Sequence, residues 1–374
     1  MRIIKFAIAL SVFFFAFILA GEKKLDYEIT LKWNKAYSKD DLAKNVIGLK
    51  WCLLFLGSSI AADSTLRGIS HGDSIIFLDV AKLGFHKKAS EHLAHLNYQL
   101  KQTGEYKETN AVDLGRYMAL TIGSPYHYYK ITGTPNHLDS LKARYTFDSI
   151  SGYIDNSGVS LVDRVISFSP SDSGKSQAFI SSEKDPDTKE IYEFETVELM
   201  PNGLVKFGIY DKNGVIKDAA DPMVTRAGKP AKCMWCHESV LQPVFRKQNN
   251  YPGHLSSNAF RDSLDRYSRQ LRRYQDSIWK DANIKNRRLH TLMEIAYIGF
   301  MEPSVERLSG EWGLPVPEVV KKVSHLQSHR HDEFNYLGDL YHRKDVDVLA
   351  PWSVMEVPER IREKSANEMD HLTD

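Results

Sequence analysis

The chain has little cysteine and almost no net charge, and both shortages exclude classes of protein. Its 374 residues include 3 Cys, too few for a disulfide-stapled scaffold. Lysine and arginine total 49 against 48 aspartate and glutamate, a formal net charge of +1. A general nucleic-acid binder normally carries a strong basic excess, so we expect no nucleic-acid partner. The composition, 42% hydrophobic and 26% charged, is that of an ordinary globular protein.

Long apolar runs are also scarce, and the one that stands out lies at the N-terminus. FAIALSVFFFAFILA (6–20) follows Arg2 and Lys5, ends at Ala20 and is succeeded by the polar GEKK. A basic start, an apolar core and a small final residue are typical of a secretory signal peptide, here residues 1–20. The run is short for a bilayer span, which needs about 20 apolar residues, and retention as an uncleaved anchor is the alternative. We therefore predict an exported chain with no membrane span after signal removal.

The pattern of the sequence changes after the signal peptide. Residues 21–145 are mainly helical in pattern, with apolar residues at helical spacing in 86–102 and again in 110–123. Residues 146–228 hold short runs rich in β-branched and aromatic residues, separated by clusters of Gly, Pro, Asn and Asp. Such runs predict strands joined by hairpins, and so an antiparallel β meander.

Helical spacing returns in residues 229–345, and a polar tail follows at 346–374. Apolar residues between 260 and 278 alternate steps of four and three, which predicts one long amphipathic helix. The predicted fold class is α+β, with an N-terminal helical region, a central antiparallel meander and a C-terminal helical region.

Two of the three cysteines stand in AKCMWCHES (231–239), at the junction of the predicted sheet and the C-terminal helices. On a helical turn Cys233, Cys236 and His237 project from one face, because residues three and four apart are neighbours. Covalent haem needs this arrangement, with two thiols for the vinyl groups and an imidazole for the iron. Cys-x-x-Cys-His is the attachment pattern of c-type haem, and neutral imidazole is its axial donor.

Two other interpretations of the motif stay open. A thioredoxin-type dithiol has its first cysteine activated at a helix N-terminus directly after a strand, whereas a loop with Pro222, Gly228 and Pro230 precedes this motif. A structural zinc site needs four ligands. The third cysteine, Cys52, lies in the apolar run LKWCLLFLG and is expected to be a buried small hydrophobe. Covalent haem is therefore the favoured interpretation.

Residues 229–245, KPAKCMWCHESVLQPVF, resemble the haem-binding segment of a monohaem c-type cytochrome. The resemblance covers less than a tenth of the chain. It implies one covalent haem c on Cys233 and Cys236, His237 as proximal iron ligand, and a location in the periplasm of a Gram-negative bacterium. A sheet before the motif is similar in order to the β-rich class of cytochromes c-prime, which often leave the iron five-coordinate.

The resemblance implies electron transfer as the function. The alternative is a haem enzyme or gas-binding protein with an open iron position, acting on peroxide or a nitrogen oxide. An exported thiol-disulfide oxidoreductase is a minor alternative. In electron-transfer cytochromes a downstream methionine usually fills the distal position. Met301, in GFMEPS, and Met293 are the candidates, against the common role of methionine as core filler.

Basic residues supply the remaining candidates. Arg226, Lys229 and Lys232 surround the motif and are candidate partners of the haem propionates, which are anions at neutral pH. The segment from Arg261 to His290 holds nine Lys or Arg against four Asp, a local charge of +5. A solvated helix face explains this plainly, and docking of an acidic redox partner protein is the functional interpretation.

Overall fold

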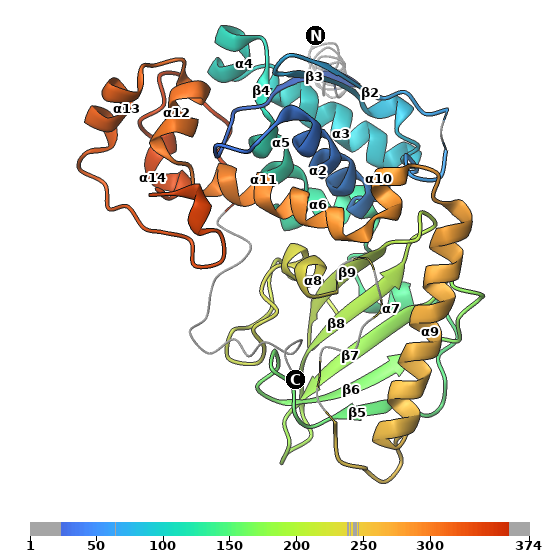
Figure 1. The fold of residues 1–374 in the computed structure, drawn as a ribbon. Helices are drawn as coiled ribbons and strands as arrows, with labels where there is room; N and C mark the ends of the chain where they lie inside the picture. The colour runs from blue at the N-terminus through green and yellow to red at the C-terminus, as the bar shows by residue number, and fades with distance from the viewer. Residues whose placement is uncertain are drawn as a thin grey trace, which may run out of the picture.

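The structure is a computed structural model that describes residues 24–358, apart from 64, 238, 240, 242–244 and 246. The signal peptide predicted for residues 1–20 lies outside the described residues. Helices of the two ends of the chain gather in one layer, and a five-stranded sheet lies beneath them (Figure 1). The predicted α+β class is confirmed. Within the described part of the chain, no helix is long and apolar enough to cross a bilayer.

The larger sheet is the predicted antiparallel meander. Its strands are β5 (Gly152–Ile154), β6 (Asp163–Phe168), β7 (Ala178–Lys184), β8 (Ile191–Leu199) and β9 (Val205–Asp211). They pair in chain order, each antiparallel to the next. The turn between β8 and β9 contains Gly203 at φ +85°, a left-handed conformation that glycine adopts without steric cost. The short strand β5 was not predicted.

A second sheet, of four strands, lies in the N-terminal region and was not predicted. Its strands are β1 (Glu28–Lys32), β2 (Ile69–Gly72), β3 (Ile75–Asp79) and β4 (Val112–Asp113), in the order β2-β3-β1-β4. Around it lie α2 (Leu42–Phe55), α3 (Lys87–Leu100), α4 (Gly104–Thr109), α5 (Leu114–Thr121) and α6 (Pro125–Thr132). α7 (Leu138–Lys142) packs instead on the five-stranded sheet, where Leu138 and Leu141 form a cluster with residues of β7 and β9. None of the four strands of the second sheet is longer than five residues, so alternation along them is too brief to be distinguished from a helical pattern.

The C-terminal half supplies the remaining helices. They are α8 (Pro230–His237), α9 (Ser257–Ile278), α10 (Ala282–Lys285), α11 (Thr291–Met301), α12 (Val305–Trp312), α13 (Val316–Val323) and α14 (Arg343–Asp347). α9 is the predicted long amphipathic helix, and it crosses the sheet (Figure 1). Its buried Phe260 packs on Phe168 of β6 with ring centroids 6.2 Å apart, and Tyr267 lies 6.1 Å from Phe179 of β7.

α11 does not cover the sheet but packs against α2 and α5, so the two ends of the chain share one core. Two glycines permit the close approach. A Cβ at Gly48 would lie 2.8 Å from the carbonyl oxygen of Leu292, and a Cβ at Gly115 would lie 2.2 Å from the Cβ of Phe300. Any larger residue at either position would push α11 away from its neighbours.

A buried charge cluster surrounds Phe300 at the end of α11. Its cations and anions are Arg116, Arg307, Arg343, Glu105, Asp113, Glu311 and Asp347. Arg343 bonds Glu311 at 2.7 Å, and its guanidinium lies 3.9 Å from the centroid of the Phe300 ring. Because these residues come from α4, β4, α5, α12 and α14, the cluster joins both ends of the chain around α11.

Candidate functional site

The cysteine motif lies on α8, a short helix between the sheet and α11 (Figure 1). The helix begins at Pro230, a residue whose fixed φ suits the first helical position. On one side the ring of His237 lies 5.7 Å from that of Phe207 on β9. On the other side the ring of Trp235 lies 5.8 Å from that of Tyr297 on α11. The predicted helical placement of the motif is therefore present, and both neighbouring layers hold the helix.

A hollow opens directly beside the motif. Cys233 and His237 line it together with Phe179 and Phe207 of the sheet and Phe260 of α9. About 120 Å³ of it can hold the centres of water-sized molecules. Sites for small molecules and cofactors are mostly apolar, with a few polar groups. The hollow has the walls of such a site.

Two charged residues of the sheet also line the hollow, and the sequence did not indicate them. The guanidinium of Arg164 on β6 donates to Glu195 on β8 at 2.5 Å and to Glu183 on β7 at 2.8 Å. Burial raises the pKa of Glu195 to about 7, although the Arg164 guanidinium opposes the rise. On a strand with alternating polar residues such side chains would be expected to face solvent, so only the structure places them beside Cys233 and His237.

A smaller cavity of about 50 Å³ adjoins the hollow. Arg164, Glu195, Cys233 and His237 line both spaces, and Cys236 lines only the smaller one. The smaller cavity is therefore the more polar of the two and brings the second cysteine to the same site.

The structure brings two of the three candidate propionate partners to this smaller cavity. Arg226 and Lys232 line it, and the Lys232 ammonium donates to the Arg226 carbonyl at 2.9 Å. Lys229 does not line either cavity, although its carbonyl accepts from the backbone N–H of Lys232 at 2.9 Å.

Electrostatics distinguish the three interpretations of the motif. Burial and then the nearby Glu195 carboxylate raise the pKa of the Cys233 thiol, whereas a thioredoxin-type nucleophile needs a lowered one. Burial and the Arg164 guanidinium lower the pKa of His237 to about 4, so its imidazole is neutral near pH 7. Its Nδ1 is buried without a hydrogen-bond partner among the described residues. The ring is thus oriented by packing on Phe207.

The zinc interpretation gains no further ligands. Among the described residues, no group of three or more His, Cys, Asp or Glu side chains is arranged to hold a metal ion. Cys52 is fully buried in α2, 3.9 Å from the hydroxyl of Thr121, and burial raises the pKa of its thiol to about 12. Its predicted place in the core is confirmed.

The two candidate distal methionines lie elsewhere. Met293 and Met301 are buried at the two ends of α11, in the core that α11 shares with α2 and α5. Neither lines the hollow or the smaller cavity. The structure therefore does not bring a thioether to the motif from these positions.

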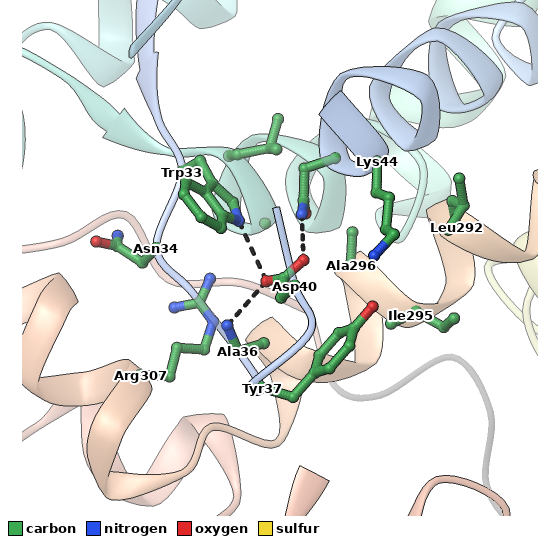
Figure 2. Close-up of a pocket in the computed structure, with 13 residues that line it drawn as sticks. Trp33, Asn34, Ala36, Tyr37, Asp40, Lys44, Leu292, Ile295, Ala296 and Arg307 are labelled. Carbon is green, nitrogen blue, oxygen red and sulfur yellow. Dashed lines mark hydrogen bonds between the residues drawn. The ribbon is translucent and has the colours of Figure 1, made fainter. Parts of the chain in front are cut away.

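A separate cavity lies near Asp40 in the N-terminal region, but it is too small for a ligand. Its volume of about 10 Å³ is at most that of one water. Figure 2 shows the Asp40 carboxylate accepting from Trp33 Nε1 at 3.2 Å and from the Ala36 N–H at 2.9 Å. The Asn45 amide donates to its other oxygen at 2.6 Å. Both oxygens of the Asp40 carboxylate therefore accept hydrogen bonds that hold the loop before α2.

Comparison of the chain with family models, with curated proteins and with solved structures finds no match. The functional argument therefore depends on the motif and the geometry around it.

Proposed function

We propose that this chain is an exported c-type haem protein that exchanges electrons with a redox partner in the periplasm of a Gram-negative bacterium. One observation carries the proposal: Cys233 and His237 of a Cys-x-x-Cys-His helix line a mostly apolar hollow. Cys236 lines the adjoining cavity, so all three residues of the motif border one or both of these neighbouring spaces.

The residues around the hollow fit a flat apolar group with an anionic edge. Phe179 and Phe207 of the sheet form one wall and Phe260 of α9 part of the other. Arg226 and Lys232 border the smaller cavity, where they would pair with propionates. Cys233 and Cys236 would hold the haem through thioethers, and His237 would ligate the iron. When bound, haem supplies one-electron redox chemistry and a position for small ligands.

A second role is supported by the lining of the hollow. Among the described residues that line it, no methionine is present and His237 is the only imidazole. The polar pair of Arg164 and Glu195 lies there instead. This favours an open iron position, and with it a gas-binding protein or an enzyme acting on peroxide or a nitrogen oxide, as the second candidate function.

Covalent attachment is the first test. The chain is co-expressed with a cytochrome c maturation system and analysed by pyridine haemochrome spectroscopy and intact mass. We expect one haem per chain, and loss of covalent haem when Cys233 and Cys236 are both replaced by serine. Cys52→Ala is the matched control, because Cys52 is buried away from the motif and should leave attachment intact. A wild-type chain without covalent haem would contradict the proposal.

Carbon monoxide then separates the two roles. Rapid binding to the ferrous protein would indicate an open iron position. A spectrum that carbon monoxide leaves unchanged would indicate a filled distal position and pure electron transfer.

A further inference from the structure

Two tyrosines stack on each other at the edge of the five-stranded sheet. Tyr153 lies on β5, the edge strand, and Tyr251 lies in the loop that precedes α9 (Figure 1). Their ring centroids are 4.0 Å apart, and the angle between the ring planes is 27°. Aromatic pairs usually have centroids about 4.5–7 Å apart, so this contact is a close one. We call these two residues the tyrosine pair.

Each phenol of the pair donates a hydrogen bond to its own carboxylate. The Tyr153 hydroxyl donates to Asp163 of β6. The Tyr251 hydroxyl donates to Asp155 at 2.6 Å, and the Asn249 amide donates to the same oxygen at 2.6 Å. An ionised carboxylate is only an acceptor, and hydrogen bonds to it are stronger than those between neutral groups. Both phenols therefore have a proton acceptor in place.

The charge states favour transfer of a proton from phenol to carboxylate once an electron has left the ring. Burial and then the hydrogen bond to Asp163 raise the pKa of Tyr153. The hydrogen bond to Asp155 and then burial raise the pKa of Tyr251. Burial also acts to raise the pKa of Asp155, but the hydrogen bonds from Tyr251 and Asn249 outweigh it and hold that pKa below its usual value. Near pH 7 both phenols therefore carry their protons, and Asp155 is an anion.

The tyrosine pair also adjoins the hollow of the proposed haem site. Gly152 and Ile154 flank Tyr153 on β5, and Ile154 lines the hollow. A Cβ at Gly152 would lie 2.5 Å from the ring of Phe260, which also lines the hollow. Tyr153 is thus next to the wall through both of its neighbours on the strand. Because Tyr153 is 8% exposed and Tyr251 is half-buried, the pair extends from this wall towards the surface.

Hydrogen bonds on both sides of the pair join the loop of Tyr251 to β5. Gln248 Oε1 accepts from the backbone N–H groups of Asp155 and Asn156, each at 2.8 Å. The backbone N–H of Leu255 donates to the carbonyl of Ser151 at 2.9 Å. The positions of the two rings are therefore set by the backbone around them.

We propose that the tyrosine pair is a one-electron donor to the haem site when peroxide oxidises that site. The inference rests on the proposed haem site and adds a second redox group beside it. Reduction of hydrogen peroxide to two waters takes two electrons from the haem site and two protons from solvent. The tyrosine pair returns one of these electrons, and the phenol proton passes to the attached carboxylate, which leaves a neutral tyrosyl radical. The O–O bond of peroxide and one phenol O–H bond break, while three O–H bonds form, two in the waters and one on the carboxylate.

The test uses the full haem-loaded protein, hydrogen peroxide and rapid-freeze electron paramagnetic resonance. We expect a tyrosyl radical in the wild type and its loss when Tyr153→Phe and Tyr251→Phe are combined, because phenylalanine keeps the stacked rings but has no phenol proton to give. Tyr192→Phe is the matched control and should keep the radical. The Tyr192 hydroxyl also donates to a carboxylate, that of Asp185 at 2.7 Å, but both residues are exposed.

A further variant tests the role of the carboxylate. Asp155→Asn is combined with Tyr153→Phe, so that Tyr251 is the remaining phenol of the pair. The asparagine carbonyl can still accept the hydrogen bond from Tyr251, but it is a poor proton acceptor. We expect the radical in Tyr153→Phe alone and its loss in this combination. A radical of equal yield in both would overturn the part assigned to Asp155.

The outcomes decide the proposal without depending on the variants alone. In the wild type, the spin trap DMPO followed by peptide mass spectrometry locates the radical, and an adduct on Tyr251 or Tyr153 supports the proposal. Adducts found only on other residues overturn it, as does a radical that survives in the double phenylalanine variant. A radical formed by peroxide in the haem-free Cys233→Ser/Cys236→Ser chain overturns the route through the haem site. A wild-type chain without a haem spectrum refutes the proposed function itself, and this is seen before peroxide is added.

Discussion

Replacing Arg164 with methionine removes a cation that bonds two carboxylates of the sheet, Glu183 and Glu195. Arg164 is mostly buried, and its guanidinium bonds Glu195 at 2.5 Å and both Glu183 and the Ser181 hydroxyl at 2.8 and 3.0 Å. Glu183 is fully buried. Methionine has a similar length and fills much of the same space, so the change tests charge more than volume.

The expected loss follows from this geometry. Removal of one partner from a buried ion pair costs about 3–5 kcal/mol, because the remaining charge stays buried without compensation. Two carboxylates depend on Arg164 here. At pH 8 we therefore expect the free energy of unfolding to fall by about 3–5 kcal/mol, a large share of the 5–15 kcal/mol of a typical domain.

The fall in the free energy of unfolding caused by this substitution should become smaller as the pH is lowered. In the folded wild type the pKa of Glu195 is about 7, above the value of about 4.3 for an unfolded glutamate. An acid with a raised folded pKa stabilises the fold below its unfolded pKa, and this stability decreases as the pH rises through the folded pKa. Without Arg164 the pKa of Glu195 rises further, so at pH 5 the carboxyl is neutral. The cost at pH 5 should therefore be smaller than at pH 8, because neutral Glu195 no longer contributes an uncompensated charge, although the contact of Arg164 with Glu183 is still lost.

Urea denaturation followed by far-UV circular dichroism at pH 5 and pH 8 measures both values. Arg330→Met is the control, since Arg330 bonds Asp339 at 2.8 Å with both side chains exposed, and an exposed pair contributes little to stability. A loss below about 1 kcal/mol at pH 8, or a loss that grows as the pH falls, would refute the reasoning about this buried group.

Two further predictions test the site and the core. Met293→Leu and Met301→Leu should leave the haem absorption spectrum and midpoint potential unchanged, because neither side chain lines the hollow; a shifted spectrum in either variant would make that methionine a distal ligand. Gly115→Ala should destabilise the fold by at least about 1–3 kcal/mol in urea, since its Cβ would lie 2.2 Å from the Phe300 Cβ. Gly72→Ala, where a Cβ meets nothing within 4 Å, should cost little, and equal losses would contradict the packing argument.

The features that could be predicted from the sequence are those with a local pattern. α9 was predicted because its apolar residues repeat over 22 residues, and the meander because turn residues separate its strands. The helical placement of Cys233 and His237 also followed from spacing alone. The four-stranded sheet escaped prediction because β4 has two residues and pairs in parallel with β1, far away in sequence.

The polar wall of the site could not be predicted for a related reason. Arg164 and Glu195 are 31 residues apart in the sequence and lie on different strands. Neither residue is unusual on a strand. Their significance arises from the pairing of β6, β7 and β8, which places both next to Glu183 and beneath α8. Likewise the helical spacing of α11 predicted a helix but not its partners, since glycines on α2 and α5 decide where α11 packs.

The position of α11 gives the N-terminal region a role in the site. α8 has eight residues, and a helix this short is not stable without tertiary contacts. Trp235 supplies such a contact by packing on Tyr297 of α11, while His237 packs on Phe207 of the sheet. α11 in turn is held by α2, α5 and the charges around Phe300. The distance between the imidazole of His237 and the wall that carries Arg164 is therefore set from both sides. We infer that the N-terminal region acts as the rigid support against which the motif is held over the hollow.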